Sequence, residues 1–286
     1  MKILLTGASG QVGYELARSL QALGEVVAVD RARMDLSDLD QVRDVVRQVR
    51  PGLIVNPAAY TAVDQAESEP ELAHRVNALA PGVMAAEAAL LGAAMVHYST
   101  DYVFDGTKLG AYAEDDATGP INVYGHSKLA GEQAIAAAGI PHLILRTSWV
   151  YGMRGKNFLL TMLRLTRERD ALRVVADQHG APTWSRTIAE STLAILAQAR
   201  HGGPQWWESN SGIYHLSAQG QTTWHGFTEA IVAAAGLTCQ VVPITSADYP
   251  VPAARPVNSV MTSEKLMTRL CDLPHWHDAL RLCLAS

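Results

Sequence analysis

The sequence predicts an α/β fold, a Rossmann-type doubly wound parallel sheet with a smaller C-terminal lobe. Two observations lead to this prediction. Short apolar runs alternate with helical patterns throughout residues 1–150, as expected of repeated βα units in a parallel sheet. The first apolar run also leads into a glycine-rich turn and then into a helical pattern, which is the order typical of dinucleotide-binding sheets.

Length and composition narrow the class of protein. The 286 residues suffice for one large domain with a smaller lobe, and 48% hydrophobic residues indicate a globular chain. The net charge of −5, without a basic stripe, argues against a nucleic-acid partner. We expect no membrane helix and no signal peptide, because the apolar runs are too short. Three cysteines without C-x-x-C spacing indicate reduced thiols in a cytoplasmic protein: Cys239, Cys271 and Cys283.

The first βα unit carries the glycine turn. Residues 2–6 predict a buried strand, and a helical pattern extends to Leu23. Gly7 permits a tight turn, Gly10 lets the backbone approach a pyrophosphate, and Gly13 lets the helix pack against the strand. The helix N-terminus would then point its N–H groups at the phosphates. We therefore expect these residues to bind the cofactor: Gly7, Ser9, Gly10, Gln11, Val12 and Gly13.

The second strand, residues 25–29, ends in Asp30. An acidic residue at this position usually binds the ribose hydroxyls, which favours NADH. Arg31 follows at once, and its guanidinium could instead hold the 2′-phosphate of NADPH, so the sequence leaves the preference open. Asp35 could cap the helix that extends to about residue 50, or it could contact the adenine, with Leu36 beside it in the cofactor site.

The next two strands, residues 53–55 and 94–98, flank an alanine-rich helical region at 67–91. The small residues after the first of these strands would let a nicotinamide ribose lie close to the backbone, and we expect cofactor contacts at Ala58, Ala59 and Tyr60. His97 lies within the second strand, and we interpret it as a core residue rather than a catalytic one.

The candidate catalytic side chains lie within residues 100–128. Thr100 follows the strand, and Tyr124 and Lys128 lie four apart on a predicted helix from about 122 to 138. Residues at this spacing share a helix face. A lysine ammonium beside a phenol should lower the tyrosine pKa from its usual ~10 and suit it for general acid–base work. Tyr-x-x-x-Lys alone is a weak signal, because chance matches are common.

A strand at 141–146 ends the regular alternation, which is looser beyond residue 150. There we expect helices at 157–169, 184–199 and 222–235, strands at 172–176, 213–216 and 240–243, a loop at 201–212, and one last helix from about 263. The predicted cofactor domain is residues 1–150, with segments around 172–217 rejoining it. The predicted smaller, substrate-binding lobe is formed by residues 151–171 and 218–286.

Several stretches together resemble the extended short-chain dehydrogenase/reductase superfamily and, more closely, the dTDP-4-dehydrorhamnose reductase family. The resemblance covers nearly the whole chain and rests on LLTGASGQVG (4–13), NPAAYTAVDQAE (56–67), STDYVFDG (99–106), YGHSKLAGE (124–132), RTSWVYG (146–152), KNF (156–158), DQHGAPT (177–183) and RPVNS (255–259). It implies reduction of the C4 keto group of dTDP-4-dehydro-β-L-rhamnose by NADPH or NADH, giving dTDP-L-rhamnose.

The resemblance also implies roles for residues. Tyr124 would donate the proton, Lys128 would bind the nicotinamide ribose, and Thr100 would polarise the same carbonyl oxygen. Tyr102 stands where a dehydratase of this superfamily would have a glutamate base, which favours plain reduction. The residues expected to contact the nucleotide sugar are Thr61, Val63, Asp64, Thr100, Asp101, Tyr102, Trp149 and Arg255.

Glu15 and Glu190 remain open between two solvated carboxylates and a Mg²⁺ site between subunits of a homodimer, which the resemblance would allow. Two other functions also stay open. A nucleotide-sugar epimerase would keep its NAD bound and show no net oxidation of added NADPH. A non-catalytic, nucleotide-binding regulatory subunit should lack the tyrosine or the lysine, and both are present here.

Overall fold

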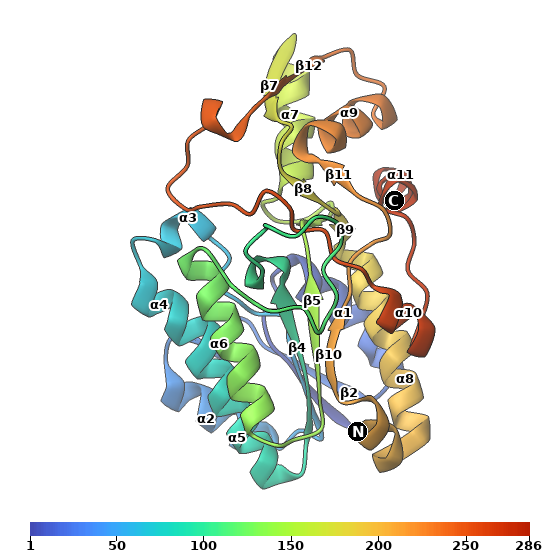
Figure 1. Ribbon diagram of the computed structural model, residues 1–286. Coiled ribbons are helices and arrows are strands. Elements are labelled where there is room, and N and C mark those ends of the chain that lie inside the picture. The colour runs from blue at the N-terminus through green and yellow to red at the C-terminus, as the bar shows by residue number, and fades with distance from the viewer.

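The computed structural model describes residues 1–286 and has a six-stranded parallel sheet at its centre (Figure 1). The order of the strands is β10-β5-β4-β3-β1-β2. They comprise β1 (Lys2–Leu5), β2 (Glu25–Ala28), β3 (Leu53–Asn56), β4 (Ala94–Thr100), β5 (His142–Thr147) and β10 (Gly212–His215). The chain runs outward from β1 to β2 and then crosses back to β3, so the switch point lies between β1 and β3. The doubly wound α/β prediction is confirmed.

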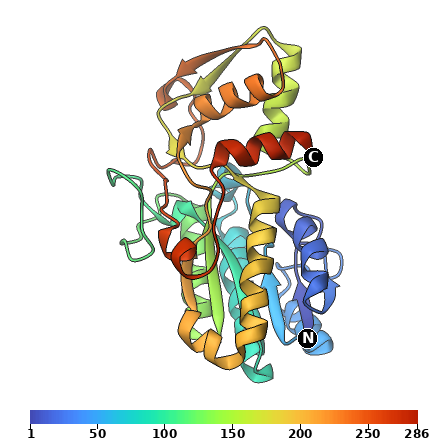
Figure 2. The ribbon, with the colours of Figure 1, turned by 90° about the vertical axis from the view of Figure 1, so that its right-hand side faces the viewer.

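Helices cover both faces of the sheet (Figure 2). On one face α1 (Gln11–Ser19) and α8 (Ser185–Asn210) pack on alternate residues of the strands. On the other face lie α2 (Leu39–Val49), α5 (Ala80–Leu91) and α6 (Val123–Ala137). Two separate apolar clusters, one per face, therefore hold the strands that end at the cleft described below.

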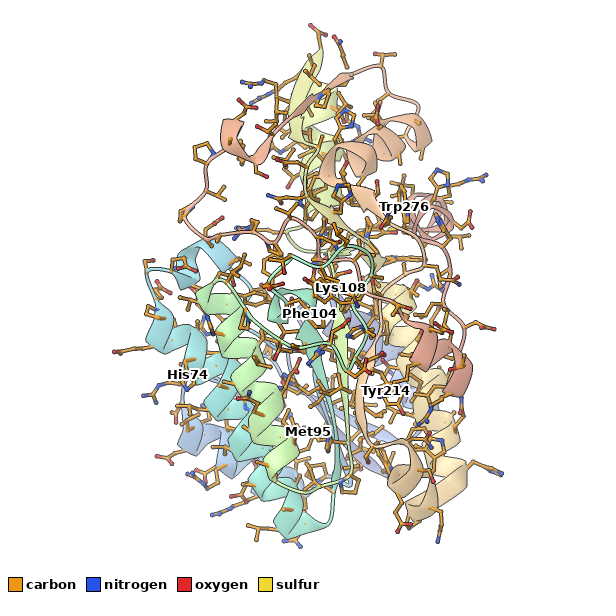
Figure 3. The ribbon with its side chains drawn as sticks, viewed as in Figure 1. His74, Met95, Phe104, Lys108, Tyr214 and Trp276 are labelled. Atoms are coloured by element: carbon orange, nitrogen blue, oxygen red, sulfur yellow. The ribbon has the colours of Figure 1, made fainter.

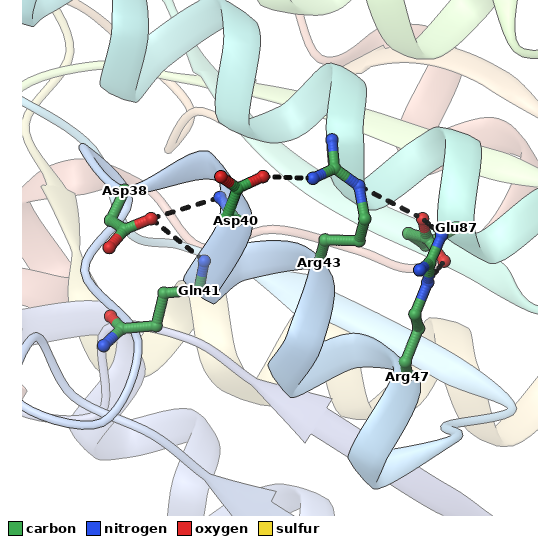
Figure 4. A network of polar contacts seen from close by, with 6 residues as sticks. All are labelled: Asp38, Asp40, Gln41, Arg43, Arg47 and Glu87. Atoms are coloured by element: carbon green, nitrogen blue, oxygen red, sulfur yellow. Dashed lines mark hydrogen bonds and ion pairs between the residues drawn. The ribbon is translucent and has the colours of Figure 1, made fainter.

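The sequence of α2 shows why this helix forms and how it packs. Its valines at 42, 45, 46 and 49 are buried, which is one face at helical spacing. Asp38 caps the helix by accepting from the backbone N–H groups of Asp40 and Gln41 (Figure 4). Arg47 donates from Nε and Nη2 to the Glu87 carboxylate of α5, both at 2.8 Å. Asp35 does not cap this helix, so capping, the first of the two roles considered for it, is wrong.

The smaller lobe lies beyond the carboxyl ends of the strands (Figures 1 and 2). Its own core includes Phe227 and Trp276 (Figure 3 labels Trp276). β7 (Ala171–Val175) pairs with β12 (Gln240–Ile244) there, and β10 alone of the strands after residue 150 joins the large sheet. The lobe also holds α7 (Phe158–Glu168), α9 (Trp224–Ala234), α11 (Trp276–Ala285), β6 (Val150–Tyr151), β8 (His179–Gly180), β9 (Thr183–Trp184) and β11 (Thr222–Thr223).

Two expectations for the C-terminal half differ from the structure. Residues 201–212 were expected as a loop, but α8 continues to Asn210 across a kink at Gly203, whose φ is 64°. In place of the one last helix expected, the structure has two, α10 (Glu264–Arg269) and α11. Leu266 of α10 packs in the apolar cluster between the large sheet and the helices α1 and α8. No helix of the protein has both the length and the apolarity needed to cross a membrane. Between α4 (Pro70–His74) and α5 the chain forms a π-helix at Arg75–Leu79.

Candidate active site

A cavity of about 490 Å³ opens at the carboxyl ends of β1, β3, β4 and β5. All fifteen residues expected to bind a cofactor line this one cavity, although they come from four stretches of the chain (7–13, 30–36, 58–60 and 124–128): Gly7, Ser9, Gly10, Gln11, Val12, Gly13, Asp30, Arg31, Asp35, Leu36, Ala58, Ala59, Tyr60, Tyr124 and Lys128. It lies beside the β1/β3 switch point, the place where open α/β sheets bind ligands.

The glycine turn forms one wall of the cavity. Gly7 has a φ of 58°, a conformation that favours glycine, and its carbonyl accepts from Gly10 N at 2.9 Å. A Cβ added at Gly13 would lie 2.1 Å from the Gly7 oxygen, so only glycine fits there. The turn thus delivers the N-terminus of α1 to the cavity with its first N–H groups free for an anion.

The end of β2 forms a second wall. The Asp30 carboxylate accepts from the backbone N–H groups of Ala32 and Arg33 at 3.1 and 3.3 Å, and so shapes its own turn. Arg31 lies 3.3 Å from the Asp35 carboxylate and is mostly exposed. The backbone N–H of Ser37 is the main cause that lowers the pKa of Asp35. Both an acidic and a basic group therefore stand at this wall.

The segment after β3 is held by the π-helix. Asn77 accepts from Tyr60 N at 2.8 Å, donates to Tyr60 O at 3.0 Å, and donates to Ser127 Oγ of α6 at 2.9 Å. Single π-helical turns are frequent at functional sites. The structure shows this one, but the periodicity of the sequence does not predict it. Asn77 fixes the cavity wall at residues 58–60 relative to the helix that carries Tyr124.

Tyr124 and Lys128 both face the cavity from α6, which begins at the Asn122 cap. Lys128 Nζ donates to the Tyr98 carbonyl at 2.6 Å and lies 3.2 Å from His97 Nε2. Burial raises the pKa of Tyr124 to about 12 and lowers the pKa of Lys128 to about 8. The expected fall in the tyrosine pKa is therefore wrong, because burial, the largest cause, outweighs the lowering effect of the Thr100 hydroxyl.

The turn after β4 packs against Tyr124. Thr100 Oγ1 donates to Asp101 Oδ1 at 3.0 Å and accepts from Tyr102 N at 3.2 Å. The second Asp101 oxygen is buried without a partner, and burial raises the pKa of this carboxyl to about 6. The Tyr102 ring meets the Tyr124 ring edge-on, with centroids 5.9 Å apart. Thr100, Asp101 and Tyr102 thus lie beside the Tyr124 phenol.

Of the residues expected to contact the sugar, Thr61 lines the cavity, and Val63 and Asp64 begin α3 (Val63–Ala66) beside it. Arg255 Nη2 lies 2.9 Å from Asp64 Oδ1, and its guanidinium lies 5.9 Å from the Tyr102 ring centroid. The segment after β12 therefore crosses over the end of the sheet, and the structure brings Asp64, Tyr102 and Arg255 together.

Trp149 and the two glutamates lie apart from the cavity. Trp149 stacks on Trp224 with centroids 3.5 Å apart and an interplanar angle of 7°, so one ring face is covered by protein. Glu190 pairs with Arg186 on its own helix at 2.8 Å. No group of three or more His, Cys, Asp or Glu side chains is arranged to hold a metal ion.

Sequence reasoning missed several residues around the cavity. Lys156 is a cation at its rim, immediately before the Asn157 cap of α7, whose Nδ2 donates to Gln11 Oε1 at 2.8 Å. Tyr98, Ser99 and Thr147 line it from the ends of β4 and β5. Strand-end position was the available signal for these three. For Lys156 the KNF motif was the only signal.

Comparisons with known proteins agree with this geometry. The family model described as the RmlD substrate binding domain matches residues 1–286. The dTDP-4-dehydrorhamnose reductase of Burkholderia thailandensis is 51% identical, over 99% of this chain and 98% of that protein, and that of Salmonella typhimurium is 46% identical, over 100% and 98%. A dTDP-4-dehydrorhamnose reductase structure from Bacillus anthracis, in complex with NADP, is 36% identical with a TM-score of 0.90, covering 99% and 98%.

Proposed function

Because this chain belongs to the dTDP-4-dehydrorhamnose reductase family, matched along its whole length by the RmlD substrate binding domain model, we propose that it reduces dTDP-4-dehydro-β-L-rhamnose with NAD(P)H to dTDP-L-rhamnose. The observation that carries the proposal is the single cavity that joins the glycine turn to Tyr124 and Lys128. The chain is thus an oxidoreductase with a nicotinamide cofactor, which supplies the hydride.

The cofactor would lie along the carboxyl ends of the strands, with its pyrophosphate on the turn from Gly7 to Val12. Asp30 would accept from the adenosine ribose, and Arg31 would contact a 2′-phosphate after leaving Asp35. Residues 1–150, with β10 and α8, would form the cofactor domain, and the smaller lobe would cover the sugar nucleotide.

Tyr124 would act as the proton donor to the carbonyl oxygen. A phenol whose pKa is about 12 is protonated at neutral pH, so it has a proton to give when hydride transfer makes that oxygen basic. Lys128 would bind the nicotinamide ribose. Thr100 would donate a second hydrogen bond to the oxyanion after breaking its bond to Asp101.

The substrate would be gripped at the edge of the cavity. Asp64, Tyr102 and Arg255 already contact one another there, and a guanidinium suits a diphosphate because it donates two parallel hydrogen bonds. We propose that Arg255 exchanges the Asp64 carboxylate for a phosphate oxygen. Thr61, Val63 and Asp101 would contact the sugar, and the half-buried Trp149, outside the cavity described above, would wall the sugar site from the side of the smaller lobe.

The test follows oxidation of NADPH and of NADH with dTDP-4-dehydro-L-rhamnose and with other keto-sugar nucleotides. Tyr124→Phe should reduce turnover by roughly 10²–10⁴-fold, since it removes only the donated proton. Tyr151→Phe is the matched control, because it removes a buried hydroxyl in the smaller lobe that has no partner. Near-normal turnover in Tyr124→Phe would refute the mechanism. Tightly bound NAD with no net oxidation of added NADPH would indicate an epimerase instead.

A further inference from the structure

Four buried polar side chains form a chain beneath the cavity, from the end of β1 through β3 and β4 to α6. Thr6 Oγ1 donates to Asn56 Oδ1 at 2.6 Å. Asn56 Nδ2 lies 3.0 Å from His97 Nδ1, and His97 Nε2 lies 3.2 Å from Lys128 Nζ. None of the four side chains is more than 1% exposed. The mechanism above uses only Lys128.

The direction of each hydrogen bond determines the next one, because an amide nitrogen and an ammonium can only donate. With the Asn56 nitrogen toward His97, Nδ1 must accept. The proton of the neutral ring then lies on Nε2 and points at Lys128 Nζ. This bond needs a free lone pair on Nζ, so it belongs to a neutral Lys128 amine.

A Lys128 ammonium requires the opposite direction. His97 Nε2 must then accept, and Nδ1 must carry the ring proton. The Asn56 amide turns by half a rotation, so that its oxygen accepts from Nδ1 and its nitrogen donates to Thr6. The Thr6 hydroxyl serves in both arrangements, since a hydroxyl both donates and accepts. Each of the four side chains therefore keeps at least one hydrogen-bond partner among the others in either charge state.

The surroundings of Lys128 allow both its charged and its neutral form near neutral pH. The titratable groups that act on it are His97 from β4 and Glu132 from its own helix, which Arg146 of β5 holds. Tyr124 lines the same cavity from that helix. Burial lowers the pKa of Lys128 to about 8 against the effect of Glu132. Burial, and then the Lys128 charge, keep the pKa of His97 well below its usual value, so the ring stays neutral.

We propose that His97 is a positioning residue for Lys128, and that the Thr6–Asn56–His97 chain reverses its hydrogen-bond direction when Lys128 gains or loses one proton. The change takes up one proton from solvent. It starts with a neutral Lys128 amine and the His97 proton on Nε2, and it ends with a Lys128 ammonium and the His97 proton on Nδ1. The inference rests on the proposed function, because a ribose-binding lysine must keep its place in either charge state.

The experiment is a two-bond ¹H–¹⁵N spectrum of the cofactor-free protein with ¹⁵N-labelled histidine, recorded from pH 6.5 to pH 9.5. The His97 signals are those missing from His97→Leu. We expect a neutral ring that carries its proton on Nδ1 at low pH and on Nε2 at high pH, with a midpoint near 8. His215 is an internal control, because its Nδ1 lies 3.0 Å from the Thr262 carbonyl and its buried Nε2 has no hydrogen-bond partner.

Variants test whether the reversal depends on the hydrogen bonds that link Thr6, Asn56, His97 and Lys128. Lys128→Met should abolish it and leave one tautomer at every pH. Asn56→Asp should hold the proton on Nδ1 throughout, since a carboxylate only accepts. Thr192→Val, which removes the buried hydrogen bond to the Tyr98 hydroxyl, should leave the reversal unchanged.

One tautomer across the whole pH range in the wild type, an imidazolium at pH 6.5, or a reversal that persists in Lys128→Met would overturn the proposal. If Asn56→Asp does not fold, the wild type and Lys128→Met decide alone. The spectrum requires neither cofactor nor substrate. A reversal in a protein that does not reduce the sugar nucleotide would therefore refute the proposed function, while the reversal of the hydrogen bonds would itself be established.

Discussion

A buried ion pair ties the helix that carries Tyr124 and Lys128 to the sheet. Arg146 of β5 donates from Nε and Nη2 to the two carboxylate oxygens of Glu132, at 2.9 and 2.7 Å, and the two side chains are 2% and 3% exposed. Removing one partner of such a pair leaves an uncompensated buried charge. We therefore expect Glu132→Leu to lower the free energy of unfolding by about 3–5 kcal/mol.

The assay is urea unfolding followed by tryptophan fluorescence, with variants compared at fixed pH. Replacing both partners, Glu132→Leu with Arg146→Met, should recover most of the loss, because no charge then stays buried. Glu168→Gln is the control, since its pair with Arg164 on α7 is about half exposed and should change stability by less than ~1 kcal/mol. A loss below ~1 kcal/mol in Glu132→Leu, or a double variant as unstable as the single one, would contradict this reasoning.

Three further outcomes are expected. Asp30→Ala should weaken NADH binding more than NADPH binding, measured by titration, and equal losses would remove its ribose role. Gly13→Ala would place a methyl group 2.1 Å from the Gly7 oxygen and should abolish NADPH binding, whereas Gly119→Ala, with 3.6 Å to its nearest atom, should not. Burial lowers the pKa of Lys128 from 10.5 to about 8. Between these pH values the unfolded state binds more protons than the folded state, so the free energy of unfolding should rise with pH. Urea unfolding at pH 7.5 and 9.5 should show this rise in the wild type and not in Lys128→Met.

The strands of the large sheet were predictable because their signal is local. Each is a short apolar run bounded by turn residues, and the buried positions Leu4, Ile54 and Val96 follow directly from it. The end of α8 was not predictable in this way. Gly203 and Pro204 usually end a helix, and here the chain bends at φ 64° and resumes its helix, because Trp206 and Trp207 pack against the core.

The site was predictable where chemistry depends on strand ends and helical spacing. All fifteen expected cofactor residues surround one cavity, because the carboxyl ends of parallel strands meet at one edge. Contacts between distant segments could not be found that way. Arg255 contacts Asp64 and Trp149 contacts Trp224, although the residues of each pair are far apart in the sequence and no sequence motif links them. The high pKa of Tyr124 depends on burial, which spacing does not report.

The Trp149–Trp224 stack joins the turn between β5 and β6 to the first residue of α9. Trp149 follows β5 of the large sheet, and Trp224 begins α9 of the smaller lobe. Two indoles at 3.5 Å and 7° share their electronic excitation, and such coupling produces a paired positive and negative band in circular dichroism. Loss of this paired band would therefore report, without any label, that the turn after β5 and the start of α9 have separated.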